Sequence, residues 1–390
     1  KYTGVLKPTN FEIFQETLEE NHMGDQSEDF LMASGKLQAL CYKAEIEAAL
    51  RTPGFAGFQL LQLHDFPGQG TALVGVLDPF FDSKGYITAE QFRQFCEKTV
   101  PLARMKKQVY QNNETFKAQI EISHFASEPL QNQSILCQIH SSSGKLLYEK
   151  TLLSEEIPVD NAFPLGSIEF DLKDLQMAEK LTLSVTLEHS PYSNAWEFWV
   201  YPQSLSLQEG EVTITDKLDR KARTLLDKGG SVLLLTNGQI NKDHGAEVEI
   251  GFSSIFWNTM WTNGQAPHTL GILCKPEHPV FADFPTEYHS NWQWWDPVSS
   301  SQAMILDGFP AELRPLIQPI DTWFENRRLG LLFETKAAKG KLMVCSIDLN
   351  NDLSERPVSM QLLHSILNYM NSPDFNPGQE LKLDQILELM

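Results

Sequence analysis

The chain has 390 residues, a formal net charge of −20, and 42% hydrophobic and 10% aromatic residues. This length predicts two or three domains, and the apolar content is sufficient for a core in each of them. Because Lys and Arg are dispersed and the net charge is strongly negative, we expect no binding to nucleic acid. No apolar run approaches the roughly 20 residues that span a bilayer, so we also expect no membrane span.

The five cysteines are far apart in the sequence, and they are Cys41, Cys96, Cys137, Cys274 and Cys345. Apolar residues flank most of them, which predicts buried free thiols. No CxxC pair and no Cys/His cluster with zinc spacing occurs, so the pattern argues against a structural metal and against a disulfide scaffold. We therefore expect no metal site and no cofactor.

The first hundred residues predict an α/β unit. An amphipathic helix is expected within 1–21, and a second helix over Ser34–Leu50, where apolar residues recur at helical spacing before a Pro-Gly stop. The apolar run 58–63 then predicts a buried strand. Glu45 and Glu47 are two residues apart on the second helix and point to different faces, so a solvated face is expected rather than a catalytic pair.

Polar residues follow this predicted strand at once. In α/β units, ligands meet the loops at the carboxyl ends of the strands, which makes His64, Asp65 and Gln69 candidate substrate contacts. The structural alternative is that His64 and Asp65 hydrogen-bond each other or nearby backbone.

Residues 108–207 predict an immunoglobulin-like β-sandwich. Polar and apolar residues alternate with period two in several short runs, which are 116–123, 135–139 and 181–187. The aromatic run 196–202 is expected to be the last strand, which closes at Pro202. The run Ser141–Lys145 between two such segments predicts a hairpin turn.

Residues 208–390 predict an α/β domain with a mostly parallel sheet. Continuous apolar segments alternate with helical patterns at 218–228 and 358–371, and the expected strands are 231–235, 270–273, 303–306, 329–334 and 341–347.

Two aromatic stretches in this domain, 256–261 and 288–296, have the composition of a sugar subsite. Indole faces pack against the C–H groups of pyranose rings, and amides bind hydroxyls. The candidates are Trp257, Trp261, Trp292 and Trp294. The alternative is an aromatic interface with a neighbouring domain.

A thiol-dependent, amidotransferase-like hydrolase is a further hypothesis for such a sheet. A nucleophile requires a sharp strand-to-helix elbow with small residues around it. Lys275 and Pro276 follow Cys274, and Cys345 lies inside a predicted strand, so neither cysteine has that context.

Taken together, these segments resemble the C-terminal half of a family-2-type glycoside hydrolase. Residues 57–65 read GFQLLQLHD and are similar to the last strand of that family's (β/α)8 barrel, and 82–86 read DSKGY where such enzymes turn into the closing helix. Residues 289–296, HSNWQWWD, and 326–330, NRRLG, resemble a domain appended to bacterial sugar-binding-domain hydrolases. That domain is similar to a flavodoxin-like, glutamine-amidotransferase fold without its cysteine elbow.

The resemblance implies three segments: 1–107 as part of a (β/α)8 barrel, 108–207 as the sandwich and 208–390 as the amidotransferase-like domain. It implies a glycoside hydrolase acting on O-glycosidic bonds of oligosaccharides in the periplasm or outside the cell. The resemblance further implies that the catalytic glutamates lie upstream, in a missing N-terminal part of the same protein that is the expected partner. No residue here matches either glutamate, so the chain alone is expected to be inactive. The alternative is a noncatalytic carbohydrate-binding or assembly module.

Overall fold

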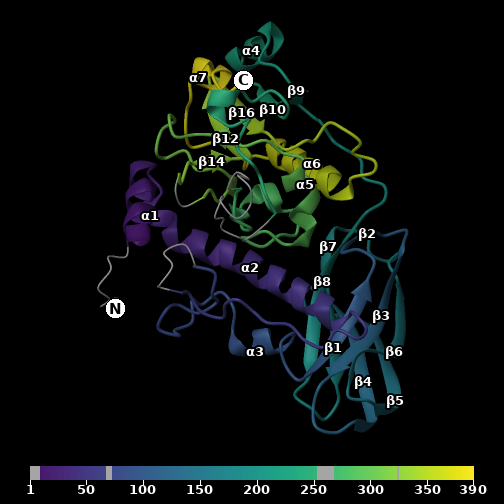
Figure 1. The fold of residues 1–390 in the computed structure, drawn as a ribbon. Coiled ribbons are helices and arrows are strands. Elements are labelled where there is room, and N and C mark those ends of the chain that lie inside the picture. Colours follow the sequence, from purple (N-terminus) through teal and green to yellow (C-terminus); the bar gives the residue numbers. More distant parts are fainter. Residues whose placement is uncertain (1–8, 67–72, 253–267, 323–324) are drawn as a thin grey trace. The chain divides into compact units, whose positions relative to one another are not determined.

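The computed structural model describes residues 9–66, 73–252, 268–322 and 325–390. The chain forms two compact units (Figure 1). The first unit contains residues 1–38, 62–86 and 205–390, and the second contains 39–61 and 87–204. No closed barrel is present among the described residues, and the fold is mixed α/β with several β-sheets.

Helices begin the first unit. They are α1 (Thr9–Glu20), the 3-10 helix η1 (Gly24–Gln26) and the first half of α2 (Ser27–Leu50). An apolar cluster joins them to the sheet of the same unit, since Leu18, Met23 and Phe30 pack with Leu273 and Ile320. The helix predicted from residue 34 is therefore present, and it begins seven residues earlier.

The strand predicted at 58–63 is wrong as a buried element. The segment has no strand assignment and bends at Leu61 and Leu63, and the pairing next to it is one isolated bridge, His64 with Leu77. Its apolar side chains are exposed, with 79% of the surface of Leu61 and 43% of that of Leu63 accessible. A strand is buried only when neighbouring strands and helices cover it, and the described residues supply none for this segment.

The second unit is a β-sandwich, as predicted. Two helical segments belong to this unit, which are the second half of α2 and the whole of α3 (Ala89–Arg93). One sheet has the order β1-β3-β6 and the other β2-β8-β7-β4-β5. The strands are β1 (Thr99–Met105), β2 (Val109–Gln111), β3 (Thr115–His124), β4 (Leu130–Ser141), β5 (Leu146–Ile157), β6 (Asp160–Asp171), β7 (Glu179–Leu187) and β8 (Ser193–Tyr201). The strand β1 lies before the boundary predicted at residue 108.

Alternating apolar residues from both sheets of the sandwich enclose one core. Phe116 and Ile120 of β3 face Ile135, Leu183 and Phe198 of the other sheet, and all five are fully buried. The predicted hairpin turn at 141–145 joins β4 to β5, with the Ser141 amide donating to the Lys145 carbonyl at 2.9 Å.

The large sheet of the first unit has the strand order β11-β13-β15-β16-β10-β9. Its strands are β9 (Val212–Thr215), β10 (Ser231–Leu235), β11 (Ile272–Cys274), β13 (Ile317–Pro319), β15 (Leu332–Ala337) and β16 (Gly340–Cys345). A separate pair is β12 (Met304–Ile305) with β14 (Leu329–Gly330). The helices are α4 (Arg220–Asp227), η2 (Lys242–His244), η3 (Pro279–Phe281), η4 (Trp292–Trp294), α5 (Trp295–Ser299), α6 (Pro357–Met370) and α7 (Leu383–Leu387).

The prediction of a mostly parallel sheet is wrong. Parallel pairing in the described sheet occurs only among β9, β10 and β16, while β15, β13 and β11 continue the sheet in antiparallel pairs. The reason is local. Two residues, Ala338 and Lys339, join β15 to β16, and a parallel pair requires a crossover of a dozen or more residues. Ala338 adopts a φ of +54°, which closes this tight turn.

Candidate functional site

The segment 62–86 of the first unit contains the predicted contacts His64 and Asp65. Asp65 is buried, and its Oδ1 accepts hydrogen bonds from Lys84 Nζ at 2.8 Å and from the Gly75 amide at 3.0 Å. Its own amide donates to the Leu77 carbonyl at 3.0 Å. The Asp65 carboxylate therefore holds this segment together, which matches the structural alternative stated for it.

His64 is half-buried, and its side chain contacts an aromatic ring rather than the ion pair of Asp65. Its imidazole stacks on the ring of Phe81, with 4.4 Å between centroids and 24° between planes. A Cβ at Gly75 would lie 2.3 Å from the carbonyl carbon of His64, so only glycine allows this close approach. The third predicted contact, Gln69, lies outside the described residues.

The second part of the aromatic stretch 288–296 is helical, since η4 begins at Trp292 and α5 follows at Trp295. Trp294 is fully buried, stacks edge-on against Phe284 at 5.2 Å and donates from Nε1 to Thr286 Oγ1 at 2.9 Å. Its indole therefore offers no open face to a ligand. Trp257 and Trp261 lie outside the described residues.

Trp295, which the sequence interpretation did not select, is exposed over 56% of its surface. The ring centroids of Trp295 and Phe252 are 5.3 Å apart. Phe252 also stacks on the partly buried Trp292, with 5.7 Å between centroids and 29° between ring planes. We call Phe252, Trp292 and Trp295 the aromatic surface. Residues three apart share one side of a helical turn, so the spacing of Trp292 and Trp295 was the signal that would have paired them.

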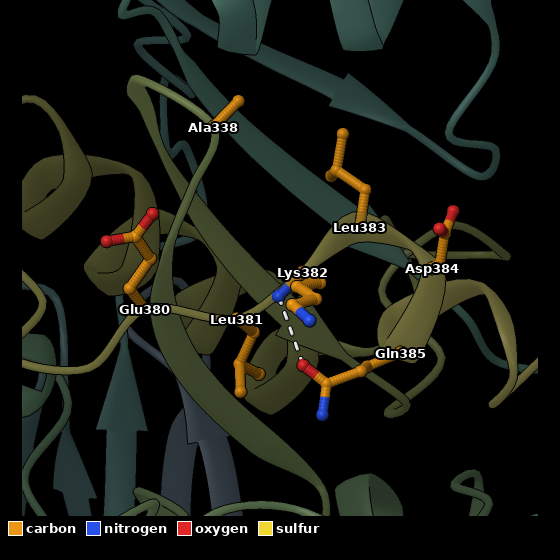
Figure 2. Close-up of a pocket in the computed structure, with 7 residues that line it drawn as sticks. All are labelled: Ala338, Glu380, Leu381, Lys382, Leu383, Asp384 and Gln385. Atoms are coloured by element: carbon orange, nitrogen blue, oxygen red, sulfur yellow. Dashed lines mark hydrogen bonds between the residues drawn. The ribbon is translucent and has the colours of Figure 1, made fainter.

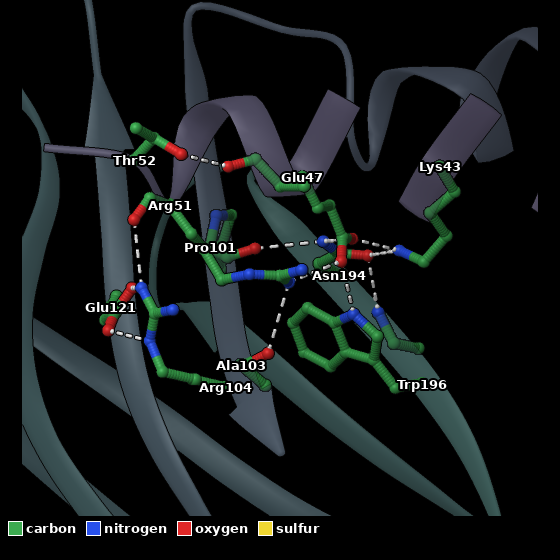
Figure 3. A network of polar contacts seen from close by, with 12 residues as sticks. Lys43, Glu47, Arg51, Thr52, Pro101, Ala103, Arg104, Glu121, Asn194 and Trp196 are labelled. Atoms are coloured by element: carbon green, nitrogen blue, oxygen red, sulfur yellow. Dashed lines mark hydrogen bonds and ion pairs between the residues drawn. The ribbon is translucent and has the colours of Figure 1, made fainter. Parts of the chain in front are cut away.

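A polar network centred on Glu47 lies in the second unit (Figure 3). Glu47 is buried, and its carboxylate accepts from Lys43 Nζ at 2.6 Å, Asn194 Nδ2 at 2.8 Å, Trp196 Nε1 at 2.8 Å and Arg51 Nη1 at 3.2 Å. The expectation of a solvated face for this glutamate is wrong. Burial lowers the pKa of Lys43, and the neighbouring Glu47 carboxylate opposes that effect.

The buried carboxylates of the described chain are all engaged by basic side chains. Glu47 pairs with Lys43 and Arg51, and the three others pair as Asp65 with Lys84, Glu121 with Arg104, and Asp321 with Arg327. A retaining glycosidase requires two carboxyl groups about 5 Å apart across the scissile bond. Paired, buried carboxylates of this kind hold structure together and are not available for that chemistry.

The thiols of the first unit are equally unsuited to nucleophilic attack. Cys274 and Cys345 are buried in β11 and β16, and burial raises the pKa of each to about 12. A thiol with this pKa stays protonated at neutral pH, whereas the nucleophile is the thiolate. The arrangement disfavours the thiol-dependent hydrolase hypothesis.

An open depression of about 520 Å³ lies at the C-terminal edge of the first unit (Figure 2). Ala338 and residues 380–385 line it, and the Lys382 amide donates to Gln385 Oε1 at 3.1 Å across it. Its side chains point in different directions and bring no acid, base and nucleophile together, so it does not resemble an active site.

Within the described ranges, no helix is long and apolar enough to cross a membrane. The same residues contain no group of three or more His, Cys, Asp or Glu side chains that could hold a metal ion.

Two family models match parts of the chain. Residues 213–390 match a domain of unknown function, DUF8487, and residues 114–202 match another, DUF8488. These ranges lie inside the predicted segments 208–390 and 108–207. No curated protein matches the chain.

Weak structural neighbours include glycoside hydrolases. A β-glucuronidase of Parabacteroides merdae is 13% identical over 35% of this chain and 21% of its own, with a TM-score of 0.20. An exo-chitosanase of Amycolatopsis orientalis is 12% identical over 42% of this chain and 18% of its own, with a TM-score of 0.25. A Salmonella α2-macroglobulin, at 12% identity over 27% of this chain and 8% of its own, reaches a TM-score of 0.21. The chain thus spans between 8% and 21% of the length of these proteins, and scores this low carry no argument about function.

Proposed function

We propose that this chain is the C-terminal portion of a glycoside hydrolase that acts on O-glycosidic bonds of oligosaccharides, with the catalytic glutamates elsewhere in that protein. The motifs at 57–65 and 82–86 are the starting point for this proposal. In it, the segment around His64 completes a (β/α)8 barrel, and the chain contributes substrate contacts rather than the reacting carboxylates. We place the enzyme in the periplasm or outside the cell.

One observation carries the proposal, and it is the open edge of the segment 62–66. Leu77 donates to the Leu63 carbonyl and accepts from the Asp65 amide, so one edge of the segment is paired. The backbone of His64 points to the opposite edge, where no partner occurs among the described residues. Leu63 and Phe66 of the same segment also have exposed side chains.

An extended apolar segment with a free edge is a liability in a folded protein, because it pairs readily with other strands. Barrels remove such edges by closing the sheet. An apolar strand with one open edge therefore fits a barrel strand whose neighbours belong to another part of the protein. This reading accounts for the exposed Leu63 better than a solvated loop would.

The test compares this chain with the full-length polypeptide encoded by its gene on a panel of aryl glycosides. We expect turnover of at least one glycoside by the full-length protein and none by this chain. Leu63→Asp should reduce that turnover more than tenfold, because a carboxylate at a closed strand edge would be buried without a partner. The matched control is Leu146→Asp, since Leu146 on β5 is as exposed as Leu63.

Two results would overturn the proposal. The first is a full-length polypeptide that supplies no further barrel strands or that turns over no glycoside in the panel. The second is an active full-length enzyme in which Leu63→Asp and Leu146→Asp behave alike, since the segment 62–66 would then lie outside the barrel.

The second candidate function is a noncatalytic carbohydrate-binding module, and the aromatic surface favours it. Trp295 is the most exposed of the described tryptophans, next to two further rings. Loss of a stacked aromatic platform costs on the order of 1 kcal/mol or more, so Trp295→Ala should weaken oligosaccharide binding by this chain about tenfold. Tryptophan fluorescence titration measures it, and Phe125→Ala, another exposed aromatic, is the control. An unchanged spectrum with every sugar removes this candidate.

A further inference from the structure

The turn at residues 78–82 presents a phenylalanine in an unfavourable backbone conformation. Asp78 Oδ1 accepts from the amides of Phe80 at 2.8 Å and Asp82 at 2.9 Å, and the Phe81 amide donates to the Asp78 carbonyl at 3.0 Å. Within this well-bonded turn, Phe81 has a φ of +63°. This left-handed region favours Gly, Asn and Asp, and a bulky aromatic residue there is an outlier.

Burial gives little reason for a phenylalanine at this position. The side chain of Phe81 is exposed over 63% of its surface, so its burial contributes little to stability. Glycine or asparagine would make the same turn without the steric conflict between the backbone and a large side chain. A strained and exposed aromatic residue is a reason to look for a role in binding.

The ring of Phe81 is held in a fixed place. His64 stacks on it with 4.4 Å between ring centroids, and the close approach of Gly75 to the His64–Asp65 backbone and the ion pair of Asp65 with Lys84 hold the chain next to His64. Both rings are therefore positioned by the fold before any ligand arrives. Such preorganisation lowers the entropy that binding has to overcome.

We propose that Phe81 is a substrate-positioning residue whose ring receives the C–H face of an uncharged sugar unit beside His64. This inference rests on the proposed glycosidase function and adds a residue and a sugar class to it. Aromatic rings with polar groups around them are typical of sites for such ligands.

The charges around the ring favour an uncharged sugar. Asp78 and Asp82 lie in the same turn, and the nearest lysine of the segment, Lys84, is already paired with Asp65. A carboxylated sugar would meet two acidic side chains without a free basic partner. A protein ligand fits less well, because charged residues are depleted at the centre of protein interfaces.

The experiment measures kcat and KM of the full-length polypeptide for p-nitrophenyl glucosides, galactosides and glucuronides. Phe81→Asn introduces a residue that tolerates the left-handed conformation, so the melting temperature of this variant should equal or exceed that of the wild type. We expect it to lower kcat/KM at least tenfold, while Phe81→Tyr stays within threefold. Phe80→Ala removes the neighbouring exposed ring of the same turn and should stay within twofold.

The inference and the proposed function fail in different ways. An active wild type with unchanged kcat/KM in Phe81→Asn overturns the role of Phe81 alone, and so does a preference for the glucuronide over the uncharged glycosides. A wild type without activity on any glycoside overturns both. If Phe81→Asn leaves kinetics intact but shifts the mass of the native assembly in light scattering, the ring is a protein contact, and the sugar assignment is wrong.

Discussion

Replacing Glu47 with glutamine is expected to lower the free energy of unfolding of the second unit by about 3–5 kcal/mol, the range for breaking a buried ion pair from one side. The carboxylate accepts four hydrogen bonds from Lys43, Arg51, Asn194 and Trp196. A neutral amide has a single acceptor oxygen and would direct its own donors at these groups. The ammonium of Lys43 would then be left without its counter-ion.

Hydrogen exchange measures this effect locally, because a chain of two compact units is not expected to unfold in one step. We expect faster exchange in residues 39–50 of α2 and in β8, together with a lower urea midpoint. Glu45→Gln is the matched control, since Glu45 lies on the same helix and is exposed. Surface substitutions of this kind stay within about 0.5 kcal/mol.

A second substitution separates charge from packing. If an unpaired ammonium causes the loss, Lys43→Met in the Glu47→Gln background should restore part of the stability, because a buried charge without a partner is removed. A double variant that is less stable than Glu47→Gln alone would contradict this account. It would show that Lys43 acts mainly through its contacts with the rings of Phe95 and Trp196.

The sandwich could be predicted from the sequence because apolar and polar residues alternate along its strands, so that one face of each strand is buried in the core. In β7, every second residue from Leu181 to Leu187 is fully buried, and the pattern is visible without any partner. The turn Ser141–Lys145 carried its own signal as well. Local patterns of this kind need no knowledge of distant contacts.

Burial of Glu47 could not be predicted in this way. The spacing of Lys43, Glu47 and Arg51 at every fourth residue indicates ion pairs along a helix, and such pairs are usually solvated. Asn194 and Trp196, about 150 residues away in sequence, turn this stripe into a buried network. The apolar run 58–63 was misjudged for a related reason, since burial of a strand depends on neighbours that are distant in sequence. The run predicted a buried strand, but the described chain gives it no such neighbours.

The candidate site was found in part. His64 and Asp65 were selected by their place after an apolar run, and the structure gives them different surroundings, a stacked ring for His64 and an ion pair for Asp65. Phe81 was missed because its signal is a backbone angle, which no spacing in the sequence reveals. Trp295 was missed because residues 288–296 were judged by composition, so helical spacing was not applied.

Replacing Arg328 with methionine is the second substitution with a large expected effect. Arg328 has no exposed surface, and its guanidinium donates to the carbonyls of Leu306, Phe309 at 2.6 Å and Pro310 at 3.1 Å. It therefore holds the loop after β12 against the start of β14. Methionine fills a similar volume but removes all of these donors. The Leu306 and Pro310 carbonyls still accept from the amides of Phe309 and Leu313, whereas the Phe309 carbonyl loses its donor, at about 1–3 kcal/mol for a buried group left without a partner.

Removal of the buried charge offsets part of this loss, since burial also lowers the pKa of Arg328 and so disfavours its charged form. We expect a net loss of about 3 kcal/mol in the free energy of unfolding of the first unit. Arg328→Lys should lower the free energy of unfolding by nearly as much. The planar guanidinium donates to three separate carbonyls at once, and a single ammonium group cannot reach all of them.

Urea denaturation combined with hydrogen exchange at residues 306–313 measures the change, and Arg220→Met, on the exposed start of α4, is the control. The loss should not vary with salt, because the acceptors are neutral carbonyls in a buried site. A stable Arg328→Met protein would mean that the desolvation of the guanidinium balances its hydrogen bonds. Full rescue by lysine would mean that charge alone, attracted by the neighbouring Asp307 carboxylate, holds the loop in place.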